Sequence, residues 1–207
     1  MGWVTKDGGA SLRTIWNILV FVLILLLFAV LNTLVHELGH CFTIDALGGE
    51  CEGIYFMPGI RVWPLTTFGQ SSPYAGELSP AFTVFSKSAP TDQANGLALL
   101  MGSGSTAILS LLALVGLYDL RPRGWLRFPL LAQSFMFLDL LFYTILPRWF
   151  GLRHLFFIGG DTPEPLNGAI AMGVSESAFI TGVLVYSAVM VVGCARYIWK
   201  STLRRAH

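Results

Sequence analysis

Three residues near the end of the first apolar stretch have the types and spacing of a metal site: His36, Glu37 and His40. On a helix, positions four apart differ by about 40° around the axis, so both imidazoles face one way and can share an ion. The Glu37 carboxylate can take a proton from a metal-bound water and return it to a leaving amine. The motif predicts a peptide-hydrolysing zinc site, and its alternative is a polar patch where a helix leaves a membrane.

Zinc at such a site needs a further protein ligand. The candidates are Asp45, Glu50 and Glu52 shortly after the motif, and Asp139, Asp161 and His154 further along, where His154 is expected to be an interfacial residue. Asp45 is five residues beyond His40 on the same helix, in a poor direction for joining both imidazoles on one ion. Asp139 lies inside an apolar segment, where a carboxylate costs about 2.5–3.5 kcal/mol on insertion scales and is a functional candidate by default. Asp161 follows two glycines that permit close backbone approach. The residues alone leave Asp139 and Asp161 both open.

The composition is that of an integral membrane protein. Apolar residues make up 54% and charged residues 12% of the 207 residues, and the mean hydropathy is +0.65. Soluble domains carry about twice that charged fraction. No basic cluster points to nucleic acid as a partner. Cys41, Cys51 and Cys194 predict no disulfide framework, and Cys41 is expected to be a small buried apolar residue.

Four apolar helices are predicted to cross the membrane, and the first carries the histidine motif near its far end. They cover residues 14–46, 95–118, 128–146 and 178–198. The glycine- and serine-rich segment 102–105 in the second is expected to allow close helix packing rather than to form a ligand loop. The chain is thus expected to be an all-α polytopic membrane protein, with one membrane-embedded domain over residues 1–207.

The two longest connections between these helices differ in character. Prolines and glycines rule out a continuous helix between residues 50 and 91, where short strands are expected in a segment at the membrane surface or re-entering it. The expected strands cover residues 53–57, 60–63 and 81–85. Residues 147–177 are expected to form a loop, with Asn167 in a turn before Gly168 or, alternatively, binding an oxyanion.

The basic residues predict a topology. If four helices alternate in direction, nine of the 13 lysines and arginines fall on one side and four on the other. The positive-inside rule then places both termini in the cytoplasm and the motif end of the first helix toward the outside. The plasma membrane is the expected location, because no targeting segment indicates an organelle.

A histidine motif inside an apolar helix, with a distal aspartate, resembles the site-2 protease family of intramembrane zinc metalloproteases. In that family an Asn-x-x-Pro segment precedes an Asp-Gly whose aspartate is the third zinc ligand. Here residues 144–147 end in the proline and Gly160-Asp161 takes the place of the aspartate, whereas Thr162 replaces the usual glycine and Thr144 the asparagine. The resemblance covers residues 14–173, without a PDZ-like insertion. It implies Zn²⁺ held by His36, His40 and Asp161.

The resemblance also implies a function: an intramembrane zinc endopeptidase, with Glu37 as its catalytic residue, that hydrolyses peptide bonds of membrane-spanning substrates. The expected partners are a transmembrane protein or peptide and the lipid bilayer, and a strand edge between residues 53 and 85 could hold an extended substrate. One alternative is a catalytically inactive scaffold or regulatory binding protein that keeps the metal-site fold. A small transporter is less favoured, because the helices show no interrupted repeat pair.

Overall fold

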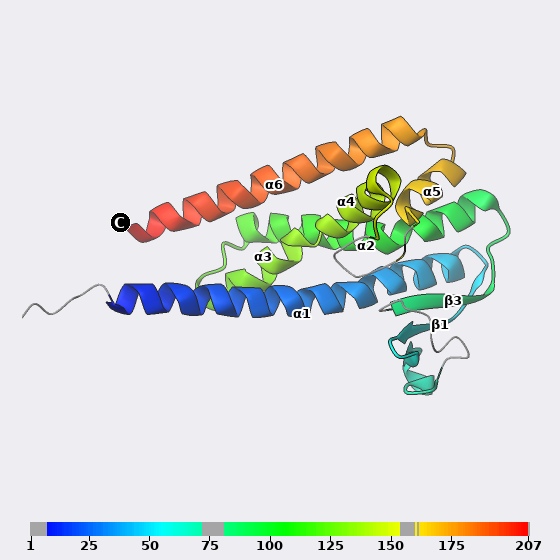
Figure 1. Ribbon diagram of the computed structural model, residues 1–207, viewed down its shortest axis with the longest axis horizontal. Helices are drawn as coiled ribbons and strands as arrows, with labels where there is room; N and C mark the ends of the chain where they lie inside the picture. Colours follow the sequence, from blue (N-terminus) through cyan, green and yellow to red (C-terminus); the bar gives the residue numbers. More distant parts are fainter. Residues whose placement is uncertain (1–7, 72–80, 154–159, 161, 207) are drawn as a thin grey trace, which may run out of the picture.

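The computed structural model describes residues 8–71, 81–153, 160 and 162–206 as long helices beside a small antiparallel sheet (Figure 1). The helices are α1 (Gly8–Ala46), α2 (Asp92–Asp119), α3 (Arg127–Phe135), α4 (Leu138–Ile145), α5 (Glu164–Ala171) and α6 (Glu176–Ala206). The strands are β1 (Glu50–Phe56), β2 (Ile60–Trp63) and β3 (Ala81–Lys87). Short helical turns η1 (Leu65–Thr67), η2 (Gly124–Leu126) and η3 (Leu146–Phe150) complete the elements.

Four helical stretches of the described chain are long and apolar enough to cross a membrane. They are Thr14–Ala46, Asp92–Asp119, Gly124–Phe150 and Glu176–Ser201. Each contains one of the four predicted segments, so the prediction of four apolar helices is confirmed at this level. The start of α1, the α2–α3 connection and the end of α6 lie together at one end of the molecule, and the sheet lies at the other (Figure 1).

The third stretch is broken rather than one continuous helix. α3 ends at Phe135 and α4 begins at Leu138, so Asp139 lies in the first turn of α4. A π turn containing Pro147 follows, and Gly151 ends it with φ +61°. Proline has no backbone N–H to donate to a helical hydrogen bond, which explains why the regular α-helix stops near Pro147.

The strands form one sheet in the order β2-β1-β3, with both pairs antiparallel. The predicted strand at 60–63 matches β2, while β1 begins earlier than predicted, at Glu50, and β3 continues to Lys87. Ile54 and Tyr55 in the central strand are fully buried. The fold is therefore mostly helical with a small sheet, which agrees with the expectation of apolar helices and short strands between the first and second of them.

A disulfide joins Cys41 near the end of α1 to Cys51 in β1, so the expectation of no disulfide is wrong. α1 ends at Ala46 and Gly48 takes φ +84°, which turns the chain back along the helix. The two cysteines, ten residues apart in sequence, thereby come to a Cα–Cα distance of 5.2 Å. Asp45 fixes the same turn, because its Oδ1 accepts a hydrogen bond from the Cys51 N–H at 2.6 Å.

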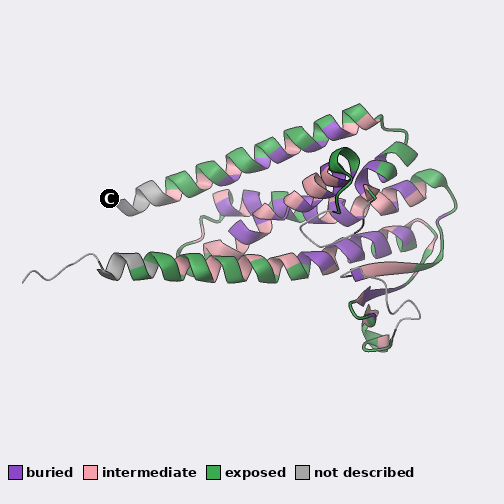
Figure 2. Ribbon diagram, viewed as in Figure 1, coloured by how far each residue is buried: buried purple, intermediate pink, exposed green. Residues whose placement is uncertain are grey.

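α1 and α2 pack closely where the histidine motif lies. A Cβ atom on Gly39 would overlap the Met101 carbonyl oxygen and lie 2.5 Å from Ser105 Oγ. The expected close packing around residues 102–105 is thus observed, and only a glycine fits at position 39. Buried residues gather in this half of α1 and along α2, whereas the first half of α1 is largely exposed (Figure 2).

Candidate metal centre

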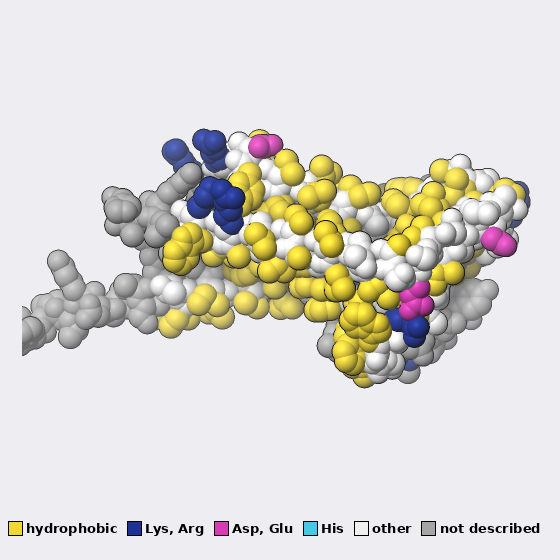
Figure 3. Space-filling model, turned by 90° about the horizontal axis from the view of Figure 1, so that it is seen from above, with side chains coloured by type: hydrophobic (Ala, Val, Ile, Leu, Met, Phe, Trp, Pro, Cys, Tyr) yellow, Lys and Arg dark blue, Asp and Glu magenta, His cyan; other side chains and the backbone are white. Residues whose placement is uncertain are grey.

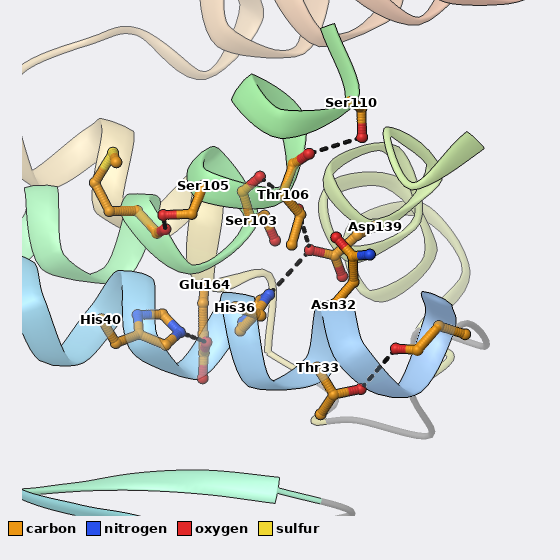
Figure 4. A network of polar contacts seen from close by, with 12 residues as sticks. Asn32, Thr33, His36, His40, Ser103, Ser105, Thr106, Ser110, Asp139 and Glu164 are labelled. Atoms are coloured by element: carbon orange, nitrogen blue, oxygen red, sulfur yellow. Dashed lines mark hydrogen bonds and ion pairs between the residues drawn. The ribbon is translucent and has the colours of Figure 1, made fainter. Parts of the chain in front are cut away.

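His36 and His40 each turn one ring nitrogen toward a hydrogen-bond acceptor and can bind an ion with the other. Figure 4 shows the contact of His36 with Asp139 and that of His40 with Glu164. His36 Nδ1 lies 2.9 Å from Asp139 Oδ2, and His40 Nδ1 lies 2.7 Å from the Ala98 carbonyl oxygen. A carbonyl or carboxylate oxygen accepts, so each Nδ1 carries the proton and each Nε2 presents a lone pair. Two buried imidazoles on one helix are therefore held in the tautomer that binds a metal.

The space beside the two Nε2 atoms is kept open by Gly102 on α2. A Cβ atom at this position would overlap His40 Nε2 and lie 2.7 Å from His36 Nε2. Any larger residue would put carbon where the two lone pairs converge. Gly102 is thus the residue whose missing side chain leaves room for an ion.

Glu164 from α5 completes a group of three ligand atoms with the imidazoles (Figure 4). The three atoms lie within 4.8 Å of one another, and Glu164 Oε2 is 3.5 Å from His40 Nε2. Two ligands of a tetrahedral zinc, each about 2.0–2.1 Å from the ion, are roughly 3.3 Å apart. Two imidazole nitrogens and a carboxylate are a donor set that zinc uses in hydrolytic sites, so these residues fit the metal.

Glu164 was missed in the sequence because residues 147–177 were expected to be a loop. The structure places it at the start of α5, which packs against α2 through two glycines. A Cβ on Gly96 would lie 2.7 Å from the Gly168 carbonyl oxygen, and one on Gly168 would lie 2.8 Å from Leu100 N. The available signal was an acidic residue next to Pro165, a combination that is common in the first turn of a helix.

The predicted third ligand, Asp161, lies outside the described residues, so it stays a prediction. Its neighbour Gly160 is described, and a Cβ there would lie 3.4 Å from the Tyr143 hydroxyl oxygen. The Tyr143 ring in turn lies 5.6 Å from the His36 ring. Among the described residues, Glu164 is the carboxylate grouped with the two histidines.

Asp139, the alternative ligand, holds a histidine instead of joining the group of ligand atoms. Its fully buried carboxylate accepts a hydrogen bond from Thr106 Oγ at 2.8 Å as well as the one from His36 Nδ1. A carboxylate in this place can orient the His36 ring, and a functional role for Asp139 stays a prediction. Asp139 contacts Nδ1 of His36, whereas the group of ligand atoms is formed by His36, His40 and Glu164.

Glu37 is held from the sheet. Its Oε2 accepts a hydrogen bond from the Thr83 hydroxyl at 2.6 Å, and Thr83 lies in β3. The side chain is nearly buried, with 9% of the residue exposed. β3 pairs with β1 along one edge, and no described strand pairs with its other edge. The sheet therefore positions the expected catalytic carboxylate and presents a strand edge beside it.

Two other residues considered in the sequence are exposed. Asn167 is exposed on α5, so the expectation that it forms a turn before Gly168 is wrong. Asp45 is exposed, and its carboxylate accepts a hydrogen bond from the Cys51 backbone N–H.

Comparisons with models of protein families, with curated proteins and with solved structures find no match to this chain. The chemistry of the centre is therefore derived from its own residues.

Proposed function

We propose that this chain is an intramembrane zinc endopeptidase whose ion is held by His36, His40 and Glu164. The observation that carries the proposal is the convergence of two Nε2 lone pairs and one carboxylate over Gly102. Glu37 follows the first ligand directly in sequence and offers the carboxylate that peptide hydrolysis requires.

The depth of the centre along α2 supports a site inside the bilayer. The helix has 28 residues, or about 42 Å at 1.5 Å per residue, against roughly 30 Å for a hydrocarbon core. Gly102 comes ten residues after Asp92, about 15 Å along the helix. A bilayer centred on α2 would therefore enclose the centre, nearer the Asp92 end.

The chain's own residues divide the work of hydrolysis. A zinc ion bound here would polarise the scissile carbonyl and acidify a water molecule. Glu37 takes the proton from the attacking water and passes it to the nitrogen of the leaving amine. Thr83 holds the Glu37 carboxylate, and Asp139 holds the His36 ring with its Nε2 toward the ligand group.

The substrate we propose is a membrane-spanning segment that unwinds locally. A helical peptide bond is shielded by its own hydrogen bonds, so cleavage needs an extended stretch with other partners for its backbone. The outer edge of β3 offers such partners, and Thr83 on the same strand reaches Glu37. This edge would hold a substrate strand alongside the catalytic carboxylate.

The test is to measure zinc content and cleavage together. Wild type and the variants Glu37→Gln, Glu164→Gln and Asp161→Asn are purified in detergent, zinc per chain is measured by mass spectrometry, and a panel of labelled single-span proteins is assayed. Glu37→Gln is expected to keep zinc and lose cleavage by at least about 100-fold, within the range attributed to general acid–base catalysis. Glu164→Gln is expected to lose zinc. Glu50→Gln, an exposed carboxylate at the same end, is the matched control.

Different results would contradict the choice of Glu164 as the third ligand and the proposed enzyme activity. Loss of zinc in Asp161→Asn with zinc retained in Glu164→Gln would replace Glu164 by Asp161 as the third ligand. A wild type without zinc would overturn the enzyme proposal and leave the scaffold or binding role. Full cleavage by Glu37→Gln would also overturn it.

A further inference from the structure

A second site lies at the end of the molecule opposite the candidate metal centre. A pocket of about 1050 Å³ opens between the end of α2, the α2–α3 connection and the last turns of α6. Figure 3 shows lysine and arginine side chains gathered at this end of the molecule. The metal centre and the sheet lie toward the other end (Figure 1).

The pocket is lined by four basic side chains: Arg121, Arg123, Arg127 and Lys200. No acidic residue lines it, and no described carboxylate forms an ion pair with Arg121, Arg123 or Lys200. The like charges of Arg121, Arg123 and Lys200 around one hollow repel one another, so the pocket favours an anion. The planar guanidinium group of arginine can donate two parallel hydrogen bonds to phosphate oxygens.

Contacts between α2 and α6 hold the walls of this pocket together. The Tyr118 hydroxyl donates to the Gly193 carbonyl oxygen at 2.9 Å, and its ring packs edge-on against Tyr197 at 5.9 Å. Arg121 has φ +47° and is the one non-glycine residue with positive φ in the part of the chain that the structure describes. Such a conformation is uncommon outside glycine and concentrates at functional positions.

A second, apolar groove adjoins the basic pocket. It has a volume of about 410 Å³, lies between α1, α3 and α6, and shares Arg127, Tyr197 and Ser201 with the basic pocket. Its wall combines the polar residues Thr14 and Asn17 of α1 with apolar residues of α1 and α3. These apolar residues are Ile18, Phe21, Phe128 and Leu131. A polar opening that continues into an apolar groove suits an amphiphile rather than a free ion.

Tryptophans place this end at a membrane interface. Trp16 on α1, Trp125 in the α2–α3 connection and Trp199 near the end of α6 are each at least 66% exposed. Exposed tryptophans at the ends of apolar helices are typical of the headgroup level of a bilayer. The basic pocket thus lies where lipid phosphates lie.

We propose that the basic pocket and the adjoining groove form one binding site for an anionic phospholipid. The phosphate lies among Arg121, Arg123 and Lys200, and an acyl chain lies in the groove beyond Arg127. The inference assumes that the apolar helices cross a bilayer, and it is independent of the metal and of catalysis.

The test uses the whole protein in detergent micelles and native mass spectrometry. Dioleoyl phosphatidylglycerol is titrated against dioleoyl phosphatidylcholine, and inorganic phosphate is titrated separately with the thermal unfolding midpoint as readout. One phosphatidylglycerol is expected to bind per chain and raise that midpoint, while phosphatidylcholine binds at least about tenfold more weakly. Stabilisation by inorganic phosphate equal to that by phosphatidylglycerol would overturn the lipid assignment, as would equal binding of both lipids.

Two variants separate the phosphate from the acyl chain. Arg121→Gln with Lys200→Gln is expected to weaken phosphatidylglycerol binding by roughly 10- to 30-fold. The matched control, Lys87→Gln with Arg153→Gln, removes two exposed charges outside the pocket and is expected to change nothing.

The second variant, Ile18→Trp, fills the groove at a residue that is 56% exposed and leaves the charges intact. It is expected to weaken phosphatidylglycerol binding at least about threefold, since one displaced methylene contact costs about that factor. Zinc content, measured on the same samples, should be unchanged in all variants. Equal losses in the pocket variant and its charge control, or full binding by Ile18→Trp, would contradict the site.

Discussion

The two halves of α1 differ in burial, as Figure 2 shows, and in polarity, and in each half the relation is the reverse of that in a soluble protein. From Leu12 to Leu31 the helix is largely apolar, and none of its described side chains is buried. From Asn32 onward it carries His36, Glu37 and His40, and all four of these polar residues are buried. A soluble protein buries its apolar residues, so this inversion is what we expect if the apolar helices cross a bilayer as proposed, with lipid around the first half of α1 and protein around the second.

The buried polar side chains in the second half of α1 need hydrogen-bond partners. Its buried amide, imidazole and carboxylate groups have partners on other elements, and the Thr33 hydroxyl donates to the Ala29 carbonyl oxygen of α1 itself. An unpaired polar group inside a bilayer would cost several kcal/mol. Asn32 meets Gln133, His36 meets Asp139, and Glu37 meets Thr83. The apolar half needs no such partners, so substitutions in the two halves should have very different consequences.

The largest effect is expected from adding one methyl group to the polar half. Gly102→Ala would place carbon against His40 Nε2 and 2.7 Å from His36 Nε2, in the space where the lone pairs converge. Zinc per chain is expected to fall below about one hundredth of wild-type occupancy at limiting metal, because both histidine ligands are obstructed. Metal titration followed by mass spectrometry measures it.

The matched control is Gly182→Ala on α6, where a Cβ atom meets nothing within 4 Å. This variant should bind zinc as the wild type does. Normal zinc binding by Gly102→Ala would place the ion elsewhere and remove the central observation behind the proposed function.

A smaller effect on zinc affinity is expected from Asp139, which contacts a histidine ligand and not the ligand group itself. Asp139→Asn keeps the shape of the side chain but removes the charge that faces His36 Nδ1. Zinc affinity is expected to fall about 10- to 100-fold, the range for groups that orient a ligand histidine. The control is Asp45→Asn, which changes another hydrogen-bonded carboxylate that lies outside the centre. Complete loss of zinc at saturating metal would make Asp139 a ligand after all.

The parts of the centre that lie on one helix are predictable from sequence. His36 and His40 face one way because helix geometry places them so, whatever surrounds them. The four apolar helices are predictable for the same local reason. The disulfide and the Glu164 position are not, since each depends on how the chain turns back and on which elements then pack together.

Glu164 and Asp139 show how this limit operates. Both are carboxylates near apolar segments, and the sequence alone cannot say which nitrogen each one meets. The close approach of Gly96 on α2 and Gly168 on α5 brings Glu164 to His40, and the break before α4 brings Asp139 to the Nδ1 side of His36. Such roles are set by contacts between distant parts of the chain.

A modest effect is expected where the polar half of α1 begins. Asn32 donates to Gln133 Oε1 at 2.9 Å and accepts from Gln133 Nε2 at 3.1 Å. Asn32→Leu is expected to lower the free energy of unfolding by about 1 kcal/mol, since side-chain hydrogen bonds between membrane helices contribute about 0.6 and at most about 1.7 kcal/mol. Thermal unfolding in nanodiscs measures it.

A double-mutant cycle isolates the pair from the change in side-chain shape. Gln133→Leu alone should cost a similar amount, and Asn32→Leu with Gln133→Leu should cost less than the sum of the two. Additive losses would show that the two amides do not stabilise one another.

The smallest effect is expected in the apolar half. Leu26 is 58% exposed, so Leu26→Ala exchanges one lipid-facing apolar side chain for a smaller one without opening a cavity in the protein. The free energy of unfolding in nanodiscs should change by less than about 0.5 kcal/mol, and zinc content should be unchanged. A loss of about 2 kcal/mol or more would instead be the cost of deleting a packed side chain. The first half of α1 would then be covered by protein, either a second copy of the chain or another partner, and the contrast between its two halves would lie in what covers each half.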